Sequence, residues 1–326
     1  MRPVRWGILA TGGIAARFTE DLGLLPDAEV IAVGSRSAQP ARRFADTHGI
    51  PRAYDSWQAL AEDPDVDVIY VATPHNAHHA AAKLCLSAGK AVLCEKPFTL
   101  DAATSADLVD TARDKGVFLM EAMWMRANPG IRRIQELIAD GAIGEVTHVA
   151  ADFGVQGPFP VGHRMRAPEL GGGALLDLGV YPVTFAHLFL GVPDSVRAWA
   201  ALTPEGTDEN TGVVLGFPSG AVATVHCGFG GETAQRATIT GAKGRIEVDR
   251  LFFRPYGFTL VRDGEAEQIS TPIRGNGMGY EAEEVMRCLR AGETESPLIP
   301  LSDTLDVMRT LDTVREQIGV VYPPQG

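Results

Sequence analysis

The chain has 326 residues, of which 45% are hydrophobic, and this length is enough for two domains with separate cores. The formal net charge is −12 at pH 7, so no basic surplus exists to replace counterions along a phosphate backbone, and a nucleic-acid partner is disfavoured. The N-terminus has no long apolar segment and no run of eighteen apolar residues occurs, so we expect a cytoplasmic protein without a membrane partner.

A strand, a glycine-rich turn and a helix are predicted at the start of the chain, at Val4–Leu9, Ala10–Ala15 and Ala16–Leu25. The turn has the pattern AxGxxA in place of the dinucleotide-binding GxGxxG, with Ala10 where the first glycine would stand. The position of the turn between a strand and a helix favours a nucleotide site. A positive φ at Ala10 would count against the motif, because alanine rarely adopts it.

The next predicted strand, Val30–Gly34, ends at Ser35 and Arg36. An NAD-binding unit normally places an acidic residue near this point to bind the ribose 2′-hydroxyl, and no acid occurs here. A hydroxyl and a guanidinium can instead accept a 2′-phosphate through charge-assisted hydrogen bonds. We therefore expect NADP in preference to NAD; the alternative is that Arg36 is a surface arginine at the start of the next helix.

The alternation of strands and helices continues over the first third of the chain. This repeated order predicts a doubly wound parallel sheet of the Rossmann type with right-handed crossovers, and we place this dinucleotide-binding domain at residues 1–123. The predicted elements are the strands Asp67–Ala72, Ala91–Cys94 and Val117–Met120 and the helices Ala77–Ala88 and Asp101–Lys115.

The strand Ala91–Cys94 leads directly into Glu95, Lys96 and Pro97, and the proline prevents the strand from continuing. Open α/β sheets bind ligands in the crevice at the carboxyl ends of their parallel strands. A lysine at this point can meet both a cofactor and a substrate. The alternative is a solvated lysine at the end of the strand, in an ion pair with Glu95.

No metal site is expected. His75, His78 and His79 lie within five residues, but no carboxylate or cysteine accompanies them at ligand spacing, and the four cysteines are far apart without a CxxC pair. The loop Thr73–His79 precedes a helix at the sheet crevice and is equally suited to a nucleotide. We expect reduced thiols and no zinc.

The second part of the chain, residues 124–326, is predicted to be an α/β domain for substrate binding and oligomerisation. It opens with the helix Asn128–Asp140, and the helices Glu281–Ala291 and Leu301–Ile318 close the chain, the last of them able to pack back on the first domain. Alternating apolar and polar residues between these helices predict a large, mostly antiparallel open sheet. Its expected strands are Val146–Phe153, Ser195–Leu202, Gly212–Phe217, Ala221–Gly228, Ala234–Ile239, Arg245–Val248 and Phe258–Val261.

A glycine-rich segment, Gly171–Gly173, interrupts these strands and precedes a helix start. Asp177 and Tyr181 are four residues apart and share one face of a continuous helix. Pro182 cannot donate to the preceding turn and should kink the helix beside Tyr181. The alternatives are a core phenol for Tyr181 and an ordinary helix N-terminal acid for Asp177.

Lysine and tyrosine together can handle the proton of an alcohol oxidation. As hydride leaves the substrate carbon, one group must take the hydroxyl proton, and a phenol with a pKa near 10 is poorly ionised at neutral pH. A nearby ammonium favours the phenolate. Lys96, Tyr181 and Asp177 are therefore predicted to form one proton-handling unit, with Asp177 orienting the lysine or the substrate.

These motifs together resemble those of the Gfo/Idh/MocA oxidoreductase family, and the similarity extends over essentially the whole chain. Most members end the last motif in histidine, whereas Tyr181 with Trp124 upstream is similar to the branch of dimeric dihydrodiol dehydrogenases and NADP-dependent D-xylose dehydrogenases. The segments that carry the resemblance are Ala10–Ala15, Thr73–Pro74 with His78, Glu95–Pro97, Met120–Trp124 and Gly171–Tyr181.

The resemblance implies that Lys96 and Tyr181 are the catalytic pair and that Asp177 supports them. It also implies that an open-faced sheet serves for dimerisation, so we expect a homodimer or higher homo-oligomer. The cofactor-binding residues expected from the motifs are Ala10, Thr11, Gly12, Gly13, Ile14, Ser35, Arg36, Thr73, Pro74, His78, Glu95 and Lys96. The substrate pocket implied by the resemblance is lined by Trp124, Phe153 and Tyr280.

We therefore predict an NADP-dependent oxidoreductase that transfers hydride between the nicotinamide and a cyclic polyol. The first candidate substrate is an aldopyranose of the xylose or glucose type, oxidised at C1 to a lactone. A trans-dihydrodiol dehydrogenase and an NADPH-dependent keto-sugar reductase are the alternatives within the same class. A non-catalytic dinucleotide-binding regulator is the alternative from another class, and the presence of Lys96, Asp177 and Tyr181 disfavours it.

Overall fold

The computed structural model describes residues 2–323, which form two compact units. Unit 1 comprises residues 2–127 and Arg274–Thr304, and unit 2 comprises Asn128–Ile273 and residues 305–323. The predicted boundary after residue 123 lies close to the first division between the units. The segment Arg274–Thr304, predicted within the second domain, belongs to unit 1.

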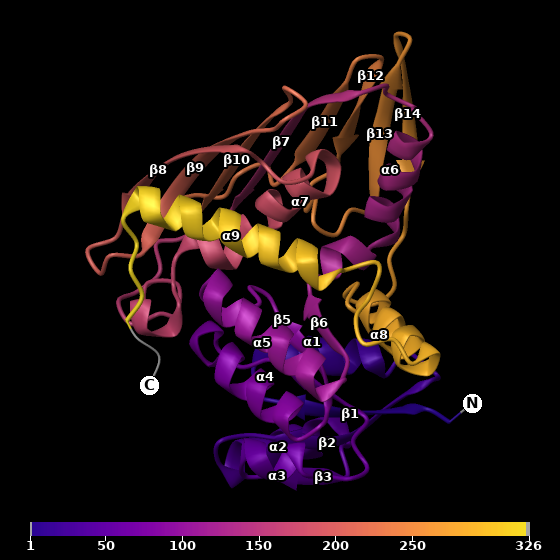
Figure 1. The fold of residues 1–326 in the computed structure, drawn as a ribbon, viewed down its shortest axis with the longest axis vertical. Helices are drawn as coiled ribbons and strands as arrows, with labels where there is room; N and C mark the ends of the chain where they lie inside the picture. Colours follow the sequence, from indigo (N-terminus) through magenta and orange to yellow (C-terminus); the bar gives the residue numbers. More distant parts are fainter. Residues whose placement is uncertain (1, 324–326) are drawn as a thin grey trace. The chain divides into compact units, whose positions relative to one another are not determined.

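Unit 1 is built on a six-stranded parallel sheet with the strand order β3-β2-β1-β4-β5-β6. Figure 1 labels most of its strands and the helices around them. The central strands are buried along nearly their whole length, as in parallel sheets covered by helices. The strands are β1 (Val4–Leu9), β2 (Ala28–Gly34), β3 (Arg52–Tyr54), β4 (Val68–Val71), β5 (Ala91–Glu95) and β6 (Leu119–Ala122). The helices are α1 (Gly13–Leu22), α2 (Ala38–His48), α3 (Trp57–Ala61), α4 (His78–Ser87), α5 (Ala102–Lys115) and α8 (Gly279–Ala291). The predicted doubly wound sheet is confirmed, with β3 as an additional short strand.

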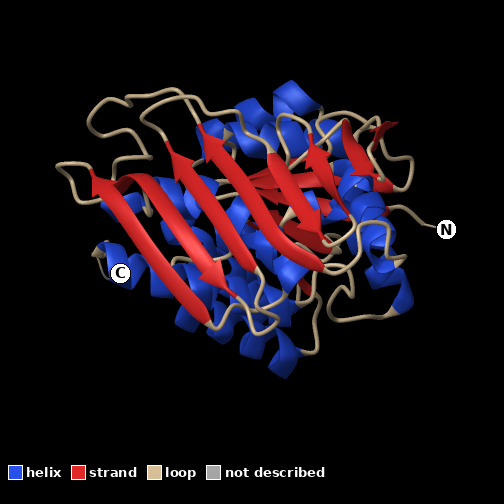
Figure 2. Ribbon diagram, turned by 90° about the horizontal axis from the view of Figure 1, so that it is seen from above, coloured by secondary structure: helices blue, strands red, loops and turns tan. Residues whose placement is uncertain are grey.

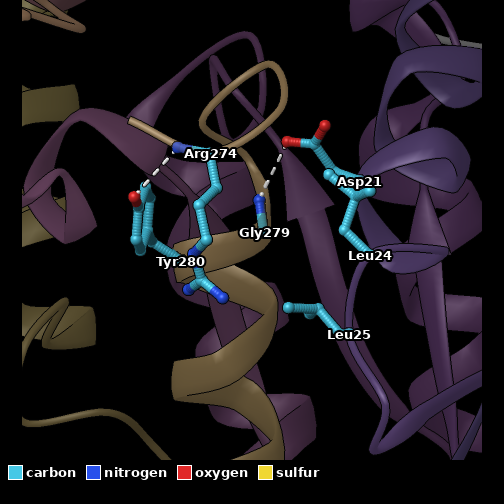
Figure 3. Close-up of a pocket in the computed structure, with 6 residues that line it drawn as sticks. All are labelled: Asp21, Leu24, Leu25, Arg274, Gly279 and Tyr280. Atoms are coloured by element: carbon cyan, nitrogen blue, oxygen red, sulfur yellow. Dashed lines mark hydrogen bonds between the residues drawn. The ribbon is translucent and has the colours of Figure 1, made fainter. Parts of the chain in front are cut away.

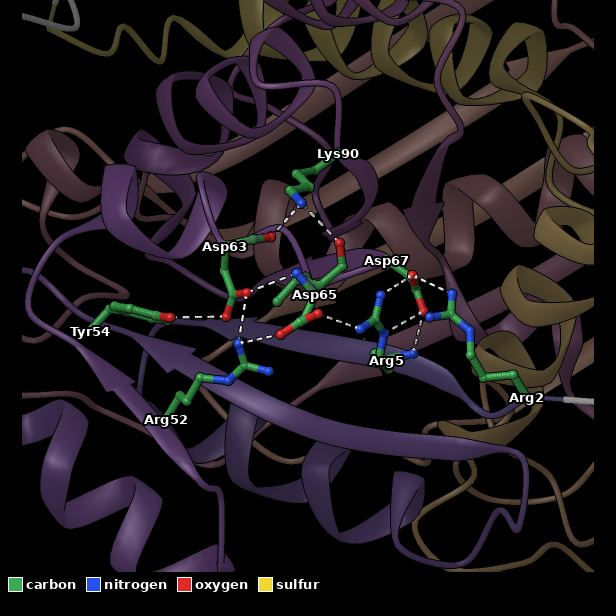
Figure 4. Close-up of polar contacts among 9 residues, drawn as sticks. Arg2, Arg5, Arg52, Tyr54, Asp63, Asp65, Asp67 and Lys90 are labelled. Atoms are coloured by element: carbon green, nitrogen blue, oxygen red, sulfur yellow. Dashed lines mark hydrogen bonds and ion pairs between the residues drawn. The ribbon is translucent and has the colours of Figure 1, made fainter.

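Charged side chains gather at the amino ends of these strands (Figure 4). Arg5 of β1 donates to Asp67, and its Nη1 lies 2.8 Å from Oδ1 of Asp65. Arg52 of β3 donates to Asp63 over 2.9 Å, and the side chain of Asp63 is fully buried. These ion pairs occupy the edge of the sheet opposite the carboxyl ends, and the carboxyl ends carry the candidate site.

Unit 2 is built on an eight-stranded sheet with the order β14-β13-β12-β11-β7-β10-β9-β8, whose strands lie side by side in Figure 2. Neighbouring strands are antiparallel except for β7 and β10, which run parallel. The strands are β7 (Val146–Gly154), β8 (Ser195–Leu202), β9 (Asp208–Gly216), β10 (Val222–Gly228), β11 (Ala237–Gly241), β12 (Gly244–Val248), β13 (Gly257–Arg262) and β14 (Glu265–Ser270). The helices are α6 (Pro129–Ala139), α7 (Val180–Leu190) and α9 (Leu301–Ile318), of which α9 begins in unit 1.

One face of this sheet is covered by helix. α7 packs against β7 and β10, and the side chains of β9 and β10 alternate between buried and exposed positions. Such alternation is expected when one face of an antiparallel sheet packs on the core and the other faces solvent. The predicted mostly antiparallel open sheet is therefore confirmed.

The segment Pro168–Leu190, which contains α7, is long and apolar enough to cross a membrane by length and composition. However, 78% of its most apolar window is buried inside the structure, as in the core helix of a globular unit. The cytoplasmic location stays a prediction.

Candidate active site

The glycine-rich turn connects β1 to α1 at the carboxyl edge of the unit 1 sheet. Gly12 is the N-cap residue of α1, and no side chain there accepts a hydrogen bond from the first N–H groups of the helix. A Cβ added at Gly12 or Gly13 would meet no heavy atom within 4 Å. Thr11 and Ile14 beside them are half-buried. Backbone N–H groups at an open helix N-terminus suit an anion such as a pyrophosphate. The turn therefore has the form of a dinucleotide-binding turn.

Ala10 adopts a φ of 108°, so this position has the positive φ that counts against the motif. Its N–H donates to the carbonyl of Gly34 over 2.9 Å, which ties the turn to the end of β2. A non-glycine residue in this region costs on the order of 1–3 kcal/mol. The turn geometry is thus reached in this chain without the glycine, with strain at Ala10.

Thr73 follows β4 and lies at the same edge of the sheet. Its side-chain Oγ1 is buried and has no hydrogen-bond partner among the described residues, and such an orphaned hydroxyl in a native structure needs an explanation. A bound nucleotide would supply the missing partner. Pro74, the next residue, is exposed and caps the short turn η1 (His75–Ala77).

His78 connects two of the loops at this edge. The residue is 1% exposed, with Nε2 2.9 Å from the carbonyl of Thr73 and Nδ1 2.8 Å from the carbonyl of Pro97. Burial lowers the pKa of His78 to about 4, so the ring is neutral at pH 7 and donates to one of the two carbonyls. The ring therefore lies beneath the loops and holds them together; direct contact between His78 and a cofactor stays a prediction.

Glu95 ends β5 and is 4% exposed. Its carboxylate accepts from the hydroxyl of Tyr70 and, over 3.1 Å, from the backbone N–H of Lys96. Tyr70 in turn stacks on Phe18 of α1, with ring centroids 3.9 Å apart. This chain of contacts fixes the backbone of Lys96 at the carboxyl end of β5, while the lysine side chain is half-buried.

Ser35 and Arg36 follow β2. The N–H of Ser35 donates to the carbonyl of Tyr54, which holds this loop at the sheet edge. Arg36 is exposed and has no ion-pair partner within residues 2–323. Its guanidinium is therefore available to a ligand, as the expected contact with a 2′-phosphate requires.

In unit 2, the segment before α7 is irregular. Leu175–Gly179 forms one turn of π-helix, labelled η4, and α7 follows directly. Pro182 lies in the first turn of α7, directly after the π-turn. A π-turn is a feature that is frequent at functional sites; the kink beside Tyr181 stays a prediction.

Asp177 lies in this π-turn and is 7% exposed. Its Oδ2 accepts from Nη2 of Arg164 over 2.9 Å, and the arginine side chain is 54% exposed. This ion pair joins the loop before the glycine-rich segment to the π-turn, and no sequence motif predicts it. Asp177 therefore has a cationic partner within unit 2.

Tyr181 packs in an aromatic cluster. Its ring centroid lies 5.7 Å from that of Phe153 and 4.9 Å from that of Phe253, and the two phenylalanines stack at 4.6 Å. The structure thus brings the predicted residues Phe153 and Tyr181 together. Phe253 was missed from the sequence; its signal is the Phe252–Phe253 pair, which follows the predicted strand Arg245–Val248 after three residues.

Trp124 and Tyr280, the other two residues expected at the substrate, belong to unit 1. Trp124 is 9% exposed in η2 (Trp124–Ala127). The hydroxyl of Tyr280 accepts from the backbone N–H of Arg274, and the arginine guanidinium lies 4.9 Å from the ring centroid (Figure 3). A small pocket beside Tyr280 is lined by Asp21, Leu24, Leu25, Arg274, Gly279 and Tyr280, and Trp124 is not among these residues.

Two buried carboxyl groups in unit 1 were also missed. Glu121 accepts from Thr304 over 2.9 Å, and burial raises the pKa of Glu121 to about 7. Glu281 of α8 is fully buried and neither carboxyl oxygen has a hydrogen-bond partner within residues 2–323. A signal was present in the sequence, because Glu281 shares the helical spacing of the buried Val285 and Cys288.

The predicted site residues therefore fall into two groups. Lys96, Trp124 and Tyr280 belong to unit 1 with the cofactor-binding residues, whereas Phe153, Asp177 and Tyr181 belong to unit 2. The joint action of Lys96 and Tyr181 stays a prediction. Among the described residues no cluster of His, Cys, Asp or Glu has the arrangement of a metal site.

Comparison with known proteins identifies the family. Residues 4–123 match the family model described as "Oxidoreductase family, NAD-binding Rossmann fold", and residues 131–247 match the one described as "GFO/IDH/MocA C-terminal domain". The chain belongs to the Gfo/Idh/MocA oxidoreductase family. The predicted family, fold class and enzyme class are thereby confirmed.

Several members of this family are similar along their whole length. Trans-1,2-dihydrobenzene-1,2-diol dehydrogenase of Mus musculus is 39% identical over 98% of both chains, and that of Homo sapiens is 37% identical over the same shares. A solved structure of a 3-ketoreductase from Actinomadura kijaniata, in complex with NADP and TDP-benzene, has a TM-score of 0.87 and 30% identity. The alignment covers 99% of this chain and 100% of that one.

Proposed function

We propose that this Gfo/Idh/MocA oxidoreductase is NADP-dependent and oxidises a ring hydroxyl of a cyclic trans-diol. The observation that carries the substrate class is the cluster of Phe153 and Phe253 beside Tyr181, because flat aromatic faces suit a flat, unsaturated ring. The relatives named trans-1,2-dihydrobenzene-1,2-diol dehydrogenase support the same class.

An aldopyranose oxidised at C1 is the second candidate. The ion pair of Arg164 and Asp177 favours it, since an exposed guanidinium next to a carboxylate offers both donors and acceptors to several hydroxyls. A keto-sugar reduced with NADPH is the same chemistry in the opposite direction, and the 3-ketoreductase with NADP bound is similar to this chain.

The residues of unit 1 fit NADP. The open N-terminus of α1 at Gly12 and Gly13 would hold the pyrophosphate, the orphaned hydroxyl of Thr73 would find its partner, and Arg36 would pair with the 2′-phosphate. When bound, the nicotinamide would supply the redox chemistry by exchanging a hydride, one proton with two electrons, with the substrate carbon. The remaining tasks are to orient the substrate and to move one proton.

We assign the transfer of the substrate's hydroxyl proton to Tyr181 and Lys96. Tyr181, as the phenolate that the ammonium group of Lys96 stabilises, accepts the hydroxyl proton during oxidation and becomes the neutral phenol. Asp177, held by Arg164, orients the substrate hydroxyl or the lysine. The carboxylate of Glu95 fixes the backbone of Lys96, so the lysine side chain extends from a fixed point at the carboxyl end of β5.

The substrate class is tested by nicotinamide absorbance with trans-1,2-dihydrobenzene-1,2-diol, D-xylose, D-glucose and an inositol, each with NADP and with NAD. Turnover of the dihydrodiol with NADP preferred is the expected result. Turnover of pyranoses alone would replace the substrate class by the second candidate. If no alcohol is oxidised but a keto-sugar is reduced with NADPH, the reaction runs in the reductive direction and not in the proposed oxidative one.

Arg36→Ala is expected to weaken the binding of NADPH by about 10- to 100-fold, because hydrogen bonds between charged groups contribute about 1.5–3 kcal/mol. The binding of NADH, which lacks the 2′-phosphate, should change by less than about twofold. Titration of protein fluorescence with each nucleotide measures both. Arg42→Ala on α2 removes an equally exposed arginine as the control, and equal losses for NADPH and NADH in Arg36→Ala would exclude the proposed contact.

We further propose that two copies of the chain associate through the open face of the unit 2 sheet. Trp199 of β8, Val214 of β9 and Val222 of β10 are 72%, 47% and 39% exposed on three neighbouring strands. Trp199→Glu would place a charge in that interface and should convert dimer to monomer in sedimentation velocity. Tyr256→Glu, which adds the same charge at another exposed aromatic residue, is the control. A wild-type monomer, or a Trp199→Glu dimer, would contradict this interface.

A further inference from the structure

The helix that carries Asp177 and Tyr181 begins from a turn of three glycines. Gly173 has a φ of 117°, and its N–H donates to the carbonyl of Met165 over 2.9 Å. The N–H of Gly172 donates to the carbonyl of Ala167, and the carbonyl of Gly172 accepts from the hydroxyl of Tyr322 over 2.8 Å. The turn is therefore held on several sides, and the helix starts from a fixed point.

Asp208, the first residue of β9, is fully buried against this turn. Its Oδ2 accepts from the backbone N–H of Leu175 over 2.7 Å and from Oγ1 of Thr211 over 2.7 Å. A Cβ added at Gly173 would lie 2.2 Å from Oδ1 of Asp208. Only glycine leaves room for the carboxylate at this point, so the turn and the acid fit each other.

The bond to Leu175 is a helix cap supplied from a distant strand. The first N–H groups of a helix have no partner within it, and the helix residues here provide no side-chain cap of their own. A carboxylate at a helix N-terminus also interacts favourably with the helix dipole. Leu175 opens the π-turn that contains Asp177, so the cap acts within two residues of a predicted site residue.

Within residues 2–323, no cation pairs with Asp208. Its other oxygen, Oδ1, has no hydrogen-bond partner among the described residues, and burial raises the pKa of Asp208 to about 6. The titratable groups that face it are Cys227 of β10 and Tyr322 after α9, and burial raises the pKa of both, so they are neutral at pH 7. A buried acid without a cation costs stability, which is unusual for a purely structural cap.

We infer that Asp208 is a positioning residue for the reaction: its carboxylate holds the first turn of the helix and thereby sets where Asp177 and Tyr181 lie. This inference rests on the proposed function, in which Tyr181 moves the proton. A displacement of about 1 Å in such a group can cost about 100-fold in rate. Asp208 does this through Leu175 and is not itself expected to touch the substrate.

The test compares Asp208→Ala and Asp208→Asn, with Asp152→Ala as the matched control. Asp152 is a carboxylate of the same unit that accepts from the backbone N–H of Gln235, outside the glycine turn. We expect Asp208→Ala to lose about 10- to 100-fold in kcat, while the affinity for NADPH changes by less than about twofold. Asp208→Asn keeps an oxygen for the N–H of Leu175 but not the negative charge, so it should recover only part of that loss, to the level that the wild type shows below about pH 6. Asp152→Ala should keep the wild-type kcat.

Two further readouts separate positioning from mere stability. The kcat of the wild type should fall as the pH drops below about 6, where Asp208 becomes protonated, and Asp208→Asn should lack this step. Amide hydrogen exchange over residues 174–178 should become faster in Asp208→Ala. If that variant does not fold, the pH profile of Asp208→Asn decides alone.

A wild-type kcat in Asp208→Ala, or an unchanged pH step in Asp208→Asn, would overturn the inference. Failure of the proposed function gives a different pattern, because Tyr181→Phe would then remain active. In that case the exchange of residues 174–178 still shows whether Asp208 holds the turn, and unchanged exchange overturns the inference on its own.

Discussion

Tyr181→Phe is expected to reduce kcat for alcohol oxidation by about 100- to 10,000-fold, which is the usual contribution of a positioned acid–base group. The substitution removes the phenol oxygen and keeps the ring. Its contacts with Phe153 and Phe253 therefore remain, so the aromatic cluster is kept. NADPH binding should be unchanged, because the proposed cofactor residues belong to unit 1.

The measurement is single-turnover and steady-state oxidation of the dihydrodiol or sugar found in the substrate panel. Tyr256→Phe, which removes a phenol oxygen from an exposed tyrosine, is the control. A kcat within twofold of the wild type in Tyr181→Phe would remove this residue from the mechanism.

The pairing with Lys96 is tested in the same experiment by Lys96→Met and by the double variant. Groups that act as one unit show non-additive losses, so the double variant should be about as slow as Tyr181→Phe alone. Strictly multiplicative losses would show that Lys96 and Tyr181 act independently.

Much of unit 1 could be predicted from the sequence because local signals coincide there. Apolar runs mark the buried strands, and glycines with positive φ end α4 and α5 at Gly89 and Gly116, as expected. The short strand β3 and the polar edge strand β14 were missed. β14 is exposed along almost its entire length and pairs only with β13, so its sequence shows no apolar alternation.

Long-range contacts explain what could not be predicted. The carboxylate of Asp21 accepts from the backbone N–H groups of Asn276, Met278 and Gly279 over 2.8 to 3.1 Å, which anchors the start of α8 in unit 1. No local pattern reports a bond between residues more than 250 positions apart. The same holds for Asp208, whose sequence context at the start of a strand gives no hint of the distant helix that it caps.

The sequence predicted the motif residues of the candidate site but not the residues that contact them. Lys96, Asp177 and Tyr181 stand out because their residue types and neighbours are unusual for core positions. The ion pair of Arg164 with Asp177 and the packing of Phe253 on Tyr181 depend on loops whose conformation no periodicity determines.

Glu281→Gln is expected to flatten the dependence of stability on pH. Burial raises the pKa of Glu281 well above its usual value, and the carboxyl groups of Glu95, Glu121 and Asp21 raise it further. The folded state therefore binds more protons than the unfolded state above pH 4.5. By linkage, the free energy of unfolding falls as the pH rises from about 4.5 through the raised pKa.

Wild-type protein should accordingly melt at a lower temperature at pH 8 than at pH 6, and Glu281→Gln should reduce this difference. Part of it should persist, because burial also raises the pKa of Glu121, to about 7, with the same sign. Glu281→Met goes further and removes both unpartnered oxygens, so it should stabilise the protein by about 1–3 kcal/mol at either pH.

Thermal unfolding of the full chain between pH 5 and 9 measures these changes. Glu283→Gln is the control on the same helix; its carboxylate is 42% exposed and paired with Arg274, so its loss should change stability by at most about 1 kcal/mol without altering the pH slope. If Glu281→Gln keeps the wild-type slope and Glu281→Met is destabilising, the buried carboxyl must be satisfied by a partner in solution, such as ordered water. The stabilising outcome would instead show that this chain keeps a costly buried acid near Glu95, a proposed cofactor-binding residue. Such a cost is typical of residues retained for function rather than for stability.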